Sequence, residues 1–123
     1  MPMPARSLIK TVTLALLLPG MAMAAPQLRL HNALAKCVSI EMTPPQSRHQ
    51  QLILEADFRI KQATAACGCT SMRVAWHSEL AGETLSQERF SLSGNTHKRL
   101  VLGATDRTQG LRELNLHFSC AAE

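Results

Sequence analysis

Apolar and polar residues alternate along three stretches of the chain. In residues 52–60, Leu52, Leu54, Ala56, Phe58 and Ile60 share one face, and the positions between them are mostly polar. Residues 72–76 and 114–118 alternate in the same way. A period of two is typical of strands that bury one face, so the pattern predicts three such strands.

Turn residues separate these stretches at short intervals, at Pro44-Pro45, Gly82, Gly94-Asn95 and between Gly103 and Gly110. Shorter strands are predicted at Leu28–Leu30, Cys37–Met42, Leu85–Leu92 and Lys98–Leu102. About seven short strands with frequent turns favour an all-β fold. We expect a two-sheet, immunoglobulin-like antiparallel sandwich, braced by disulfides.

One segment also fits a helix. Residues 55–66 are rich in helix formers, and Glu55 and Arg59 are spaced as a helical ion pair. The alternation through Ile60 is unbroken, so we favour a strand there. For Lys61 to Ala66 the sequence leaves a loop and a single helical turn equally open.

The first 24 residues have the three parts of a secretory signal. Arg6 and Lys10 supply positive charge, an apolar run follows, and Ala22-Met23-Ala24 offers small residues for cleavage after Ala24. The apolar run is shorter than the roughly 20 residues of a membrane span. We therefore expect residues 1–24 to be a signal peptide, and residues 25–123 to form a single β-sandwich domain in the periplasm or outside the cell, without membrane association after cleavage.

Charge and composition narrow the possible functions. Without Arg6 and Lys10 the number of Lys and Arg falls from 13 to 11, against 9 Asp and Glu. The remaining basic residues are scattered, and aromatic residues make up 3% of the chain. Nucleic-acid binding needs a concentrated basic face or stacking aromatics, so we expect no nucleic-acid partner.

All four cysteines (Cys37, Cys67, Cys69 and Cys120) follow the predicted signal peptide. An even count in a small exported chain indicates a disulfide framework, and four cysteines allow three pairings. We favour two long-range bridges, in which Cys37 and Cys120 each bind one of Cys67 and Cys69. The alternatives are a redox-active Cys67–Cys69 pair and free or metal-bound thiols.

The cysteine order also carries a resemblance. Cys37-Val38, the Cys67-Gly68-Cys69 segment after an alternating strand, and a last strand ending in Cys120 resemble a family of small exported bacterial proteins of unknown function. More remotely, the segment from Leu52 to Leu102 is similar to the curli-assembly inhibitor family, which is periplasmic, immunoglobulin-like and carries a Cys-x-Cys motif. That family lacks counterparts of Cys37 and Cys120. The resemblance implies a fold and a compartment more than an activity.

Candidate chemistry is sparse. The chain lacks a nucleophile elbow, a His-Glu-x-x-His motif and a phosphate-binding glycine loop. A copper or zinc site would combine cysteine thiolates with His77, His97, His117 or Met72, although His117 and Cys120 should point to opposite faces of their strand. We expect no cofactor, no resident metal and no catalytic residue, unless Cys67 and Cys69 are redox-active.

The sequence therefore favours a non-enzymatic, exported module that binds another protein, with chaperone-like activity, through an exposed strand edge. A thiol-disulfide oxidoreductase using Cys67 and Cys69 is the first alternative, and a copper-binding periplasmic protein is the second. Within the fold we expect Trp76 to anchor the core and Met72 to fill it.

Overall fold

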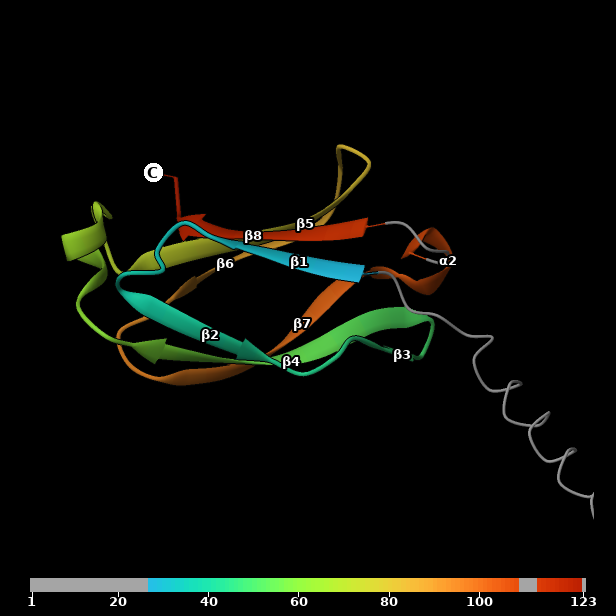
Figure 1. Cartoon of the computed structure of the whole chain (residues 1–123), viewed down its shortest axis with the longest axis horizontal. Coiled ribbons are helices and arrows are strands. Elements are labelled where there is room, and N and C mark those ends of the chain that lie inside the picture. Colours follow the sequence, from blue (N-terminus) through green and yellow to red (C-terminus); the bar gives the residue numbers. More distant parts are fainter. Residues whose placement is uncertain (1–26, 109–112, 123) are drawn as a thin grey trace, which may run out of the picture.

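The computed structural model describes residues 27–108 and 113–122 (Figure 1). Along the chain the elements are β1 (Gln27–Asn32), β2 (Val38–Met42), β3 (Gln46–Arg48), β4 (Gln51–Ile60), η3 (Thr64–Cys67), β5 (Arg73–Leu80), β6 (Glu83–Ser91), β7 (Thr96–Ala104), α2 (Thr105–Thr108) and β8 (Glu113–Cys120). The predicted signal peptide lies outside the described residues, so its cleavage remains a prediction. No helix in the described ranges is long and apolar enough to cross a membrane.

The strands form two sheets of four. The first sheet has the order β1-β8-β5-β6. In the second sheet, β2 and β3 follow each other along one edge of β4, and β7 pairs with the other edge. The all-β class and the two-sheet sandwich are thus confirmed, while the immunoglobulin-like subclass remains a prediction.

One strand pair departs from the expected antiparallel arrangement. β1 runs parallel to β8, with Leu28 opposite Leu114 and Leu30 opposite Leu116. The other pairs in the described ranges are antiparallel. Two parallel strands cannot be joined by a tight hairpin, and these two are the first and the last strand of the described chain.

The two sheets enclose one apolar core. Its largest side chains come from both sheets, and the Phe58 ring centroid lies 5.3 Å from that of Phe118 and 5.2 Å from that of Phe90. Trp76 is 3% exposed, and its indole Nε1 donates a hydrogen bond of 3.1 Å to Glu88. The core position predicted for Trp76 is confirmed.

The segment that also fitted a helix is a strand. β4 covers Gln51–Ile60 and is paired along both edges, so sheet pairing and burial override its helical propensity. Beyond it, both alternatives left open for Lys61 to Ala66 occur: residues 61–63 form a loop, and Thr64–Cys67 form a short 3₁₀ helix, η3.

Two elements were absent from the sequence prediction. β3 is a three-residue polar strand, which joins β4 through a turn where His49 and Gln50 have φ values of 50° and 66°. Two left-handed residues in succession are the conformation of a tight hairpin turn. α2 is a four-residue helix after β7. Neither segment carries apolar periodicity, so neither could be recognised from the pattern.

Candidate functional site

The Cys-Gly-Cys segment lies at one end of the sandwich and directs its two sulfur atoms to different partners. Gly68 follows η3 in a left-handed conformation with φ of 95°, which L side chains rarely adopt. On one side of this turn Cys67 is bonded to Cys37, and on the other Cys69 is bonded to Cys120. The disulfide framework favoured by the sequence is therefore present.

These pairings change the interpretation of the thiols. None of the four cysteines is free. The redox alternative required a bond between Cys67 and Cys69, and the structure instead bonds each to a distant residue. A thiolate metal site is excluded by the same pairing, because disulfide sulfur atoms carry no ligating thiolate.

Each bridge joins a buried cysteine to a half-buried one. Cys37 and Cys69 are buried, whereas Cys67 and Cys120 are half-buried. Cys120 is the last residue of β8 and is only half-buried, although the alternation places it on the apolar side of the strand. Both bridges nevertheless close long segments, of 30 and 51 positions.

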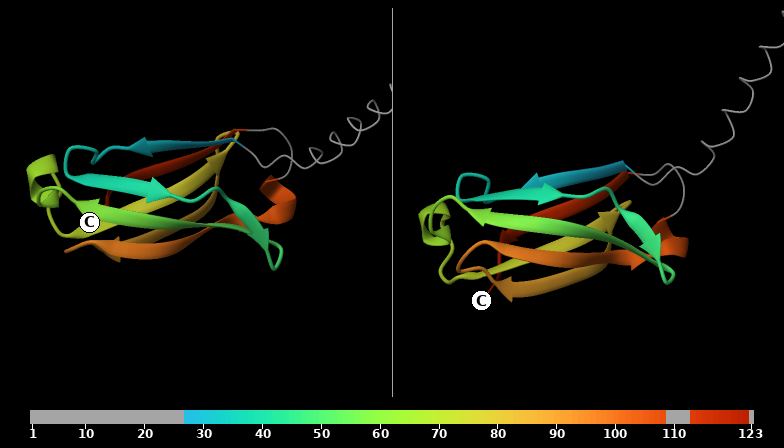
Figure 2. Two further views of the ribbon diagram at one scale, coloured as in Figure 1. Left: turned by 60° about the horizontal axis from the view of Figure 1, so that its bottom comes forward. Right: turned by 90° about the horizontal axis from the view of Figure 1, so that it is seen from below.

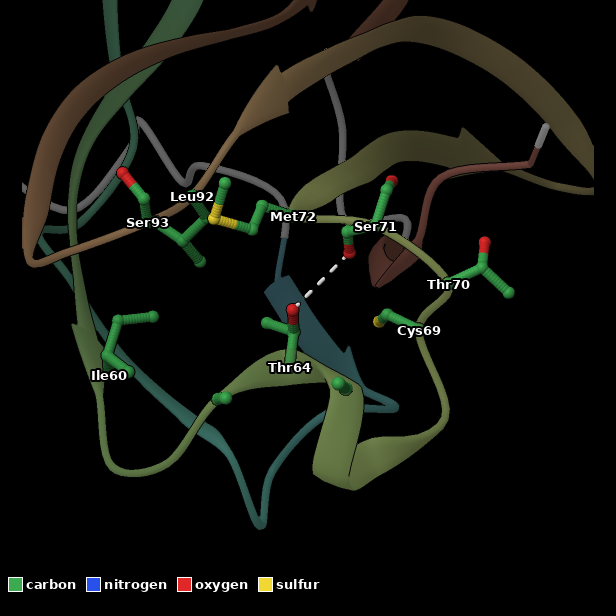
Figure 3. Close-up of a pocket in the computed structure, with 10 residues that line it drawn as sticks. Ile60, Thr64, Cys69, Thr70, Ser71, Met72, Leu92 and Ser93 are labelled. Carbon is green, nitrogen blue, oxygen red and sulfur yellow. Dashed lines mark hydrogen bonds between the residues drawn. The ribbon is translucent and has the colours of Figure 1, made fainter.

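An apolar pocket of about 220 Å³ lies beside the Cys69–Cys120 bridge (Figure 3). It is lined by Ile60, Ala63, Thr64, Ala65, Cys69, Thr70, Ser71, Met72, Leu92 and Ser93. Thr64 Oγ1 donates a hydrogen bond of 3.4 Å to the Ser71 carbonyl and holds the two sides of the pocket together.

The prediction that Met72 fills the core is wrong. Its side chain is 57% exposed at this pocket, instead of filling the interior. β5 begins at Arg73, so Met72 lies in the preceding bend and its side chain does not follow the alternation of Val74 and Trp76.

The structure brings two of the three candidate histidine ligands together and places the third in the other sheet. His77 and His117 are opposite each other on β5 and β8, and their rings stack with centroids 4.7 Å apart. His97 lies on β7, in the other sheet. The expectation that His117 and Cys120 point to opposite faces fits the alternating burial of β8.

His97 belongs to an exposed charge network on the outer face of the second sheet. Its Nδ1 lies 2.7 Å from Asp57 Oδ1 and its Nε2 lies 2.8 Å from Glu55 Oε1. Arg99 Nε donates to the second oxygen of Glu55 at 2.9 Å. The hydrogen bonds to Asp57 and then Glu55 raise the pKa of His97, whereas those from Arg99 and then His97 lower the pKa of Glu55. Glu55 and Asp57 are therefore partners of an imidazole rather than an acid–base pair.

A further candidate face is the side of the sandwich where β1 and β2 are neighbours (Figure 2). β1 is the outermost strand of the first sheet, and β2 lies on the edge of β4 that is remote from β7. Four side chains of these strands pack against the core but are only half-buried: Leu28, Leu30, Ile40 and Met42. We call this the β1/β2 side.

The free edge of β2 also presents main-chain groups. Lys61 N donates to Cys37 O at 2.7 Å, and Thr43 N donates to Glu55 O at 3.0 Å. Main-chain groups of an antiparallel strand alternate in direction, so residues of the other parity point away from β4. The N–H and C=O groups of Ile40 and Met42 therefore face outward, with no partner strand in the described part of the chain.

These features define the class of the protein: an all-β sandwich of two sheets with both disulfides closed. Two disulfides indicate a protein outside the reducing cytoplasm. The chain belongs to a bacterial family described as "Uncharacterized protein conserved in bacteria (DUF2195)", whose model matches residues 11–123. The resemblance to a small bacterial family of unknown function is thus confirmed. No curated protein and no solved structure matches the chain.

Proposed function

We propose that the protein is an exported, disulfide-braced module that binds an extended segment of another protein along the free edge of β2. The observation that carries this proposal is the combination, on the β1/β2 side, of outward main-chain groups with half-exposed apolar side chains. Main-chain pairing supplies affinity in strand addition, and side-chain contacts supply specificity.

The main-chain contribution comes from Ile40 and Met42. Their N–H and C=O groups match the spacing of an incoming strand, because bonded residues recur at every second position. The edge is short, since β2 has five residues and Pro44-Pro45 follows closely. A short edge is less prone to self-association than a long one, which suits a monomeric binding module.

The apolar contribution comes from the half-buried side chains of both strands. Leu28 and Leu30 on β1, with Ile40 and Met42 on β2, leave part of their surface to solvent beside the edge. A bound segment with apolar residues on alternate positions would cover this surface, at about 25 cal/mol per Å² of apolar area removed from water. The partner is therefore an extended, apolar-patterned segment, the kind that a chaperone-like protein shields from aggregation.

The disulfides support this role by fixing β2. Cys37 immediately precedes Val38, and its bridge to Cys67 attaches the start of β2 to η3. An edge that is held in place loses less conformational entropy on binding. The remote resemblance to the curli-assembly inhibitor family points to the same type of activity.

The proposal is tested with a photo-crosslinking amino acid at Glu41, which is exposed on β2, in protein produced with its full leader in a bacterial host. The matched control carries the same amino acid at Arg89, which is exposed on β6 at the opposite side of the sandwich. We expect discrete crosslinked products from position 41 and none of those products from position 89.

Two substitutions at Met42 separate main-chain pairing from side-chain contact. Met42→Pro removes the outward N–H, and Met42→Ala keeps it while shortening the side chain. Crosslinking from position 41 should be lost in the proline variant and reduced in the alanine variant. Equal crosslinking from both positions, or full crosslinking in a folded Met42→Pro variant, would rule out binding at this edge.

A further inference from the structure

Three histidines form a row across the outer face of the first sheet. β1, β8 and β5 are successive strands of this sheet (Figure 1). His31 on β1 is opposite His117 on β8, and His117 is opposite His77 on β5. The rings are stacked, with centroids 4.5 Å apart for His31 and His117 and 4.7 Å apart for His77 and His117. The interplanar angles are 11° and 13°. Strand register thus brings together imidazoles that lie 40 or more positions apart in the sequence.

A carboxylate completes one end of the row. Glu79 follows His77 by two positions on β5, so both side chains are on the same face. Glu79 Oε1 lies 3.4 Å from His117 Nε2. One ligand atom from each of His77, Glu79 and His117 can be chosen so that all three lie within 4.8 Å of one another.

The chemistry of these three side chains favours certain metal ions over others. Two imidazoles and a carboxylate suit borderline divalent ions such as Zn²⁺ and Cu²⁺, and the same set occurs in three-ligand zinc sites that leave a position to water. Ligand atoms about 2.0–2.2 Å from a tetrahedral ion are about 3.4 Å from one another. All three side chains are half-buried at the sheet surface. The rings of His77 and His117 are nearly parallel, so both must turn out of the stack to direct a nitrogen at one ion.

The surrounding contacts leave these three side chains available. Two other acids at the same end of the sandwich, Glu83 and Glu113, form ion pairs with Arg107 and Arg29. Glu79 has no Lys or Arg partner among the described residues, and its ion-pair partner there is His117.

His31 has a different part in the row. Its Nε2 lies 2.8 Å from Asn115 Oδ1, so this nitrogen is engaged by a neighbour. His31 stacks on the face of His117 that is remote from His77, and it restricts rotation of the His117 ring. It is a positioning residue rather than a ligand.

We propose that His77, Glu79 and His117 bind one divalent transition-metal ion of the Zn²⁺ or Cu²⁺ type. The site lies on the outer face of the first sheet and uses no cysteine. It is therefore distinct from the thiolate site considered above, and it is independent of strand addition at β2.

Calorimetric titration with Zn²⁺ tests the site, in tag-free protein purified after export so that both disulfides are formed. The wild type should bind one ion per chain. His77→Gln and His117→Gln should each weaken binding at least tenfold, and Glu79→Gln should weaken it by a smaller factor. His31→Gln should weaken it two- to fivefold, as expected for a positioning residue. Mg²⁺ should not bind, because it prefers oxygen ligands.

His97→Gln is the matched control, because it removes an exposed imidazole from the other sheet. Its affinity for Zn²⁺ should equal that of the wild type. All these substitutions are at the sheet surface, so we expect every variant to fold. Circular dichroism of each variant checks that the sheet is retained.

Nitrogen-15 NMR of the imidazole rings gives a readout for each residue. Zn²⁺ should shift the nitrogen resonances of His77 and His117 and leave those of His97 unchanged. The proposal is overturned if the wild type binds no Zn²⁺ at millimolar concentration, or if the folded double variant His77→Gln/His117→Gln binds it with wild-type affinity.

Discussion

Cys69 is bonded to Cys120 across 51 positions of sequence, and this bond attaches the end of the last strand to the segment that precedes β5. Cys120 is also opposite Val74 in the β5–β8 pair. The bridge therefore fixes the same strand ends that the sheet pairing brings together, next to the pocket at that end of the sandwich.

The first prediction concerns the stability that this bridge supplies. Closing a segment of this length restricts the unfolded chain, and the loss of such a bridge typically costs about 2–5 kcal/mol. Cys120→Ser should lower the free energy of unfolding in urea by that amount. Native wild-type protein should show no reactive thiol, and the variant should show one, at Cys69. Peptide mapping without reductant that finds Cys67 bonded to Cys69 would contradict the pairing.

A second prediction separates Trp76 from Met72. Trp76→Ala removes a large buried side chain and its hydrogen bond to Glu88, so it should cost about 3–5 kcal/mol of unfolding free energy. Met72→Ala should change the free energy of unfolding by no more than about 0.5 kcal/mol, because that side chain is mostly exposed. Denaturant unfolding followed by circular dichroism measures both. Equal losses in the two variants would mean that Met72 belongs to the core after all.

Trp76 and Met72 also show where the alternation of apolar and polar residues predicts burial correctly and where it does not. Alternation correctly predicted that Val74 and Trp76 share a buried face, because β5 is regular between them. It failed at Met72, because the strand begins one residue later and a bend changes the direction of the side chain. Alternation describes a strand only within its ends, and the ends depend on pairing with other strands.

The candidate sites were less predictable than the strands. His77 and His117 could be recognised as polar positions on outer faces, but their contact depends on the register between β5 and β8. Register is set by how two distant strands pack together, so it is not visible in either strand alone. β3 was missed for a related reason: its three polar residues form a strand only because a left-handed turn folds them against β4.

A third prediction concerns the leader. The small residues Ala22 and Ala24 favour cleavage after Ala24, which would leave two residues before β1 begins at Gln27. Protein expressed from the full sequence in a bacterial host with two membranes should be recovered from the periplasm with Ala25 as its first residue. Intact mass spectrometry of the purified protein measures this. A periplasmic protein that retains residues 1–24 would contradict the predicted signal peptide.

The last prediction is a pH dependence that originates in the His97 network. Hydrogen bonds to Asp57 and Glu55 raise the pKa of His97 above its ordinary value of 6.5. Protons are then bound more tightly in the folded state than in the unfolded state, so the stabilisation is fully present below pH 6.5 and is lost as the pH rises through the folded pKa. Glu55 has the opposite sign: its pKa is lowered from 4.5, so its stabilisation is present above pH 4.5 and is lost as the pH falls through the folded pKa.

Together the two shifts predict that the network stabilises the fold most between about pH 4.5 and 6.5. The melting temperature of the wild type should exceed that of His97→Gln in this window, and the difference should shrink as the pH rises to 8. The network is exposed, so 1 M NaCl should reduce the difference at pH 5.5 as well. NMR titration of the His97 ring provides a direct check, and a midpoint at or below 6.5 would show that the two carboxylates do not hold the imidazolium in solution.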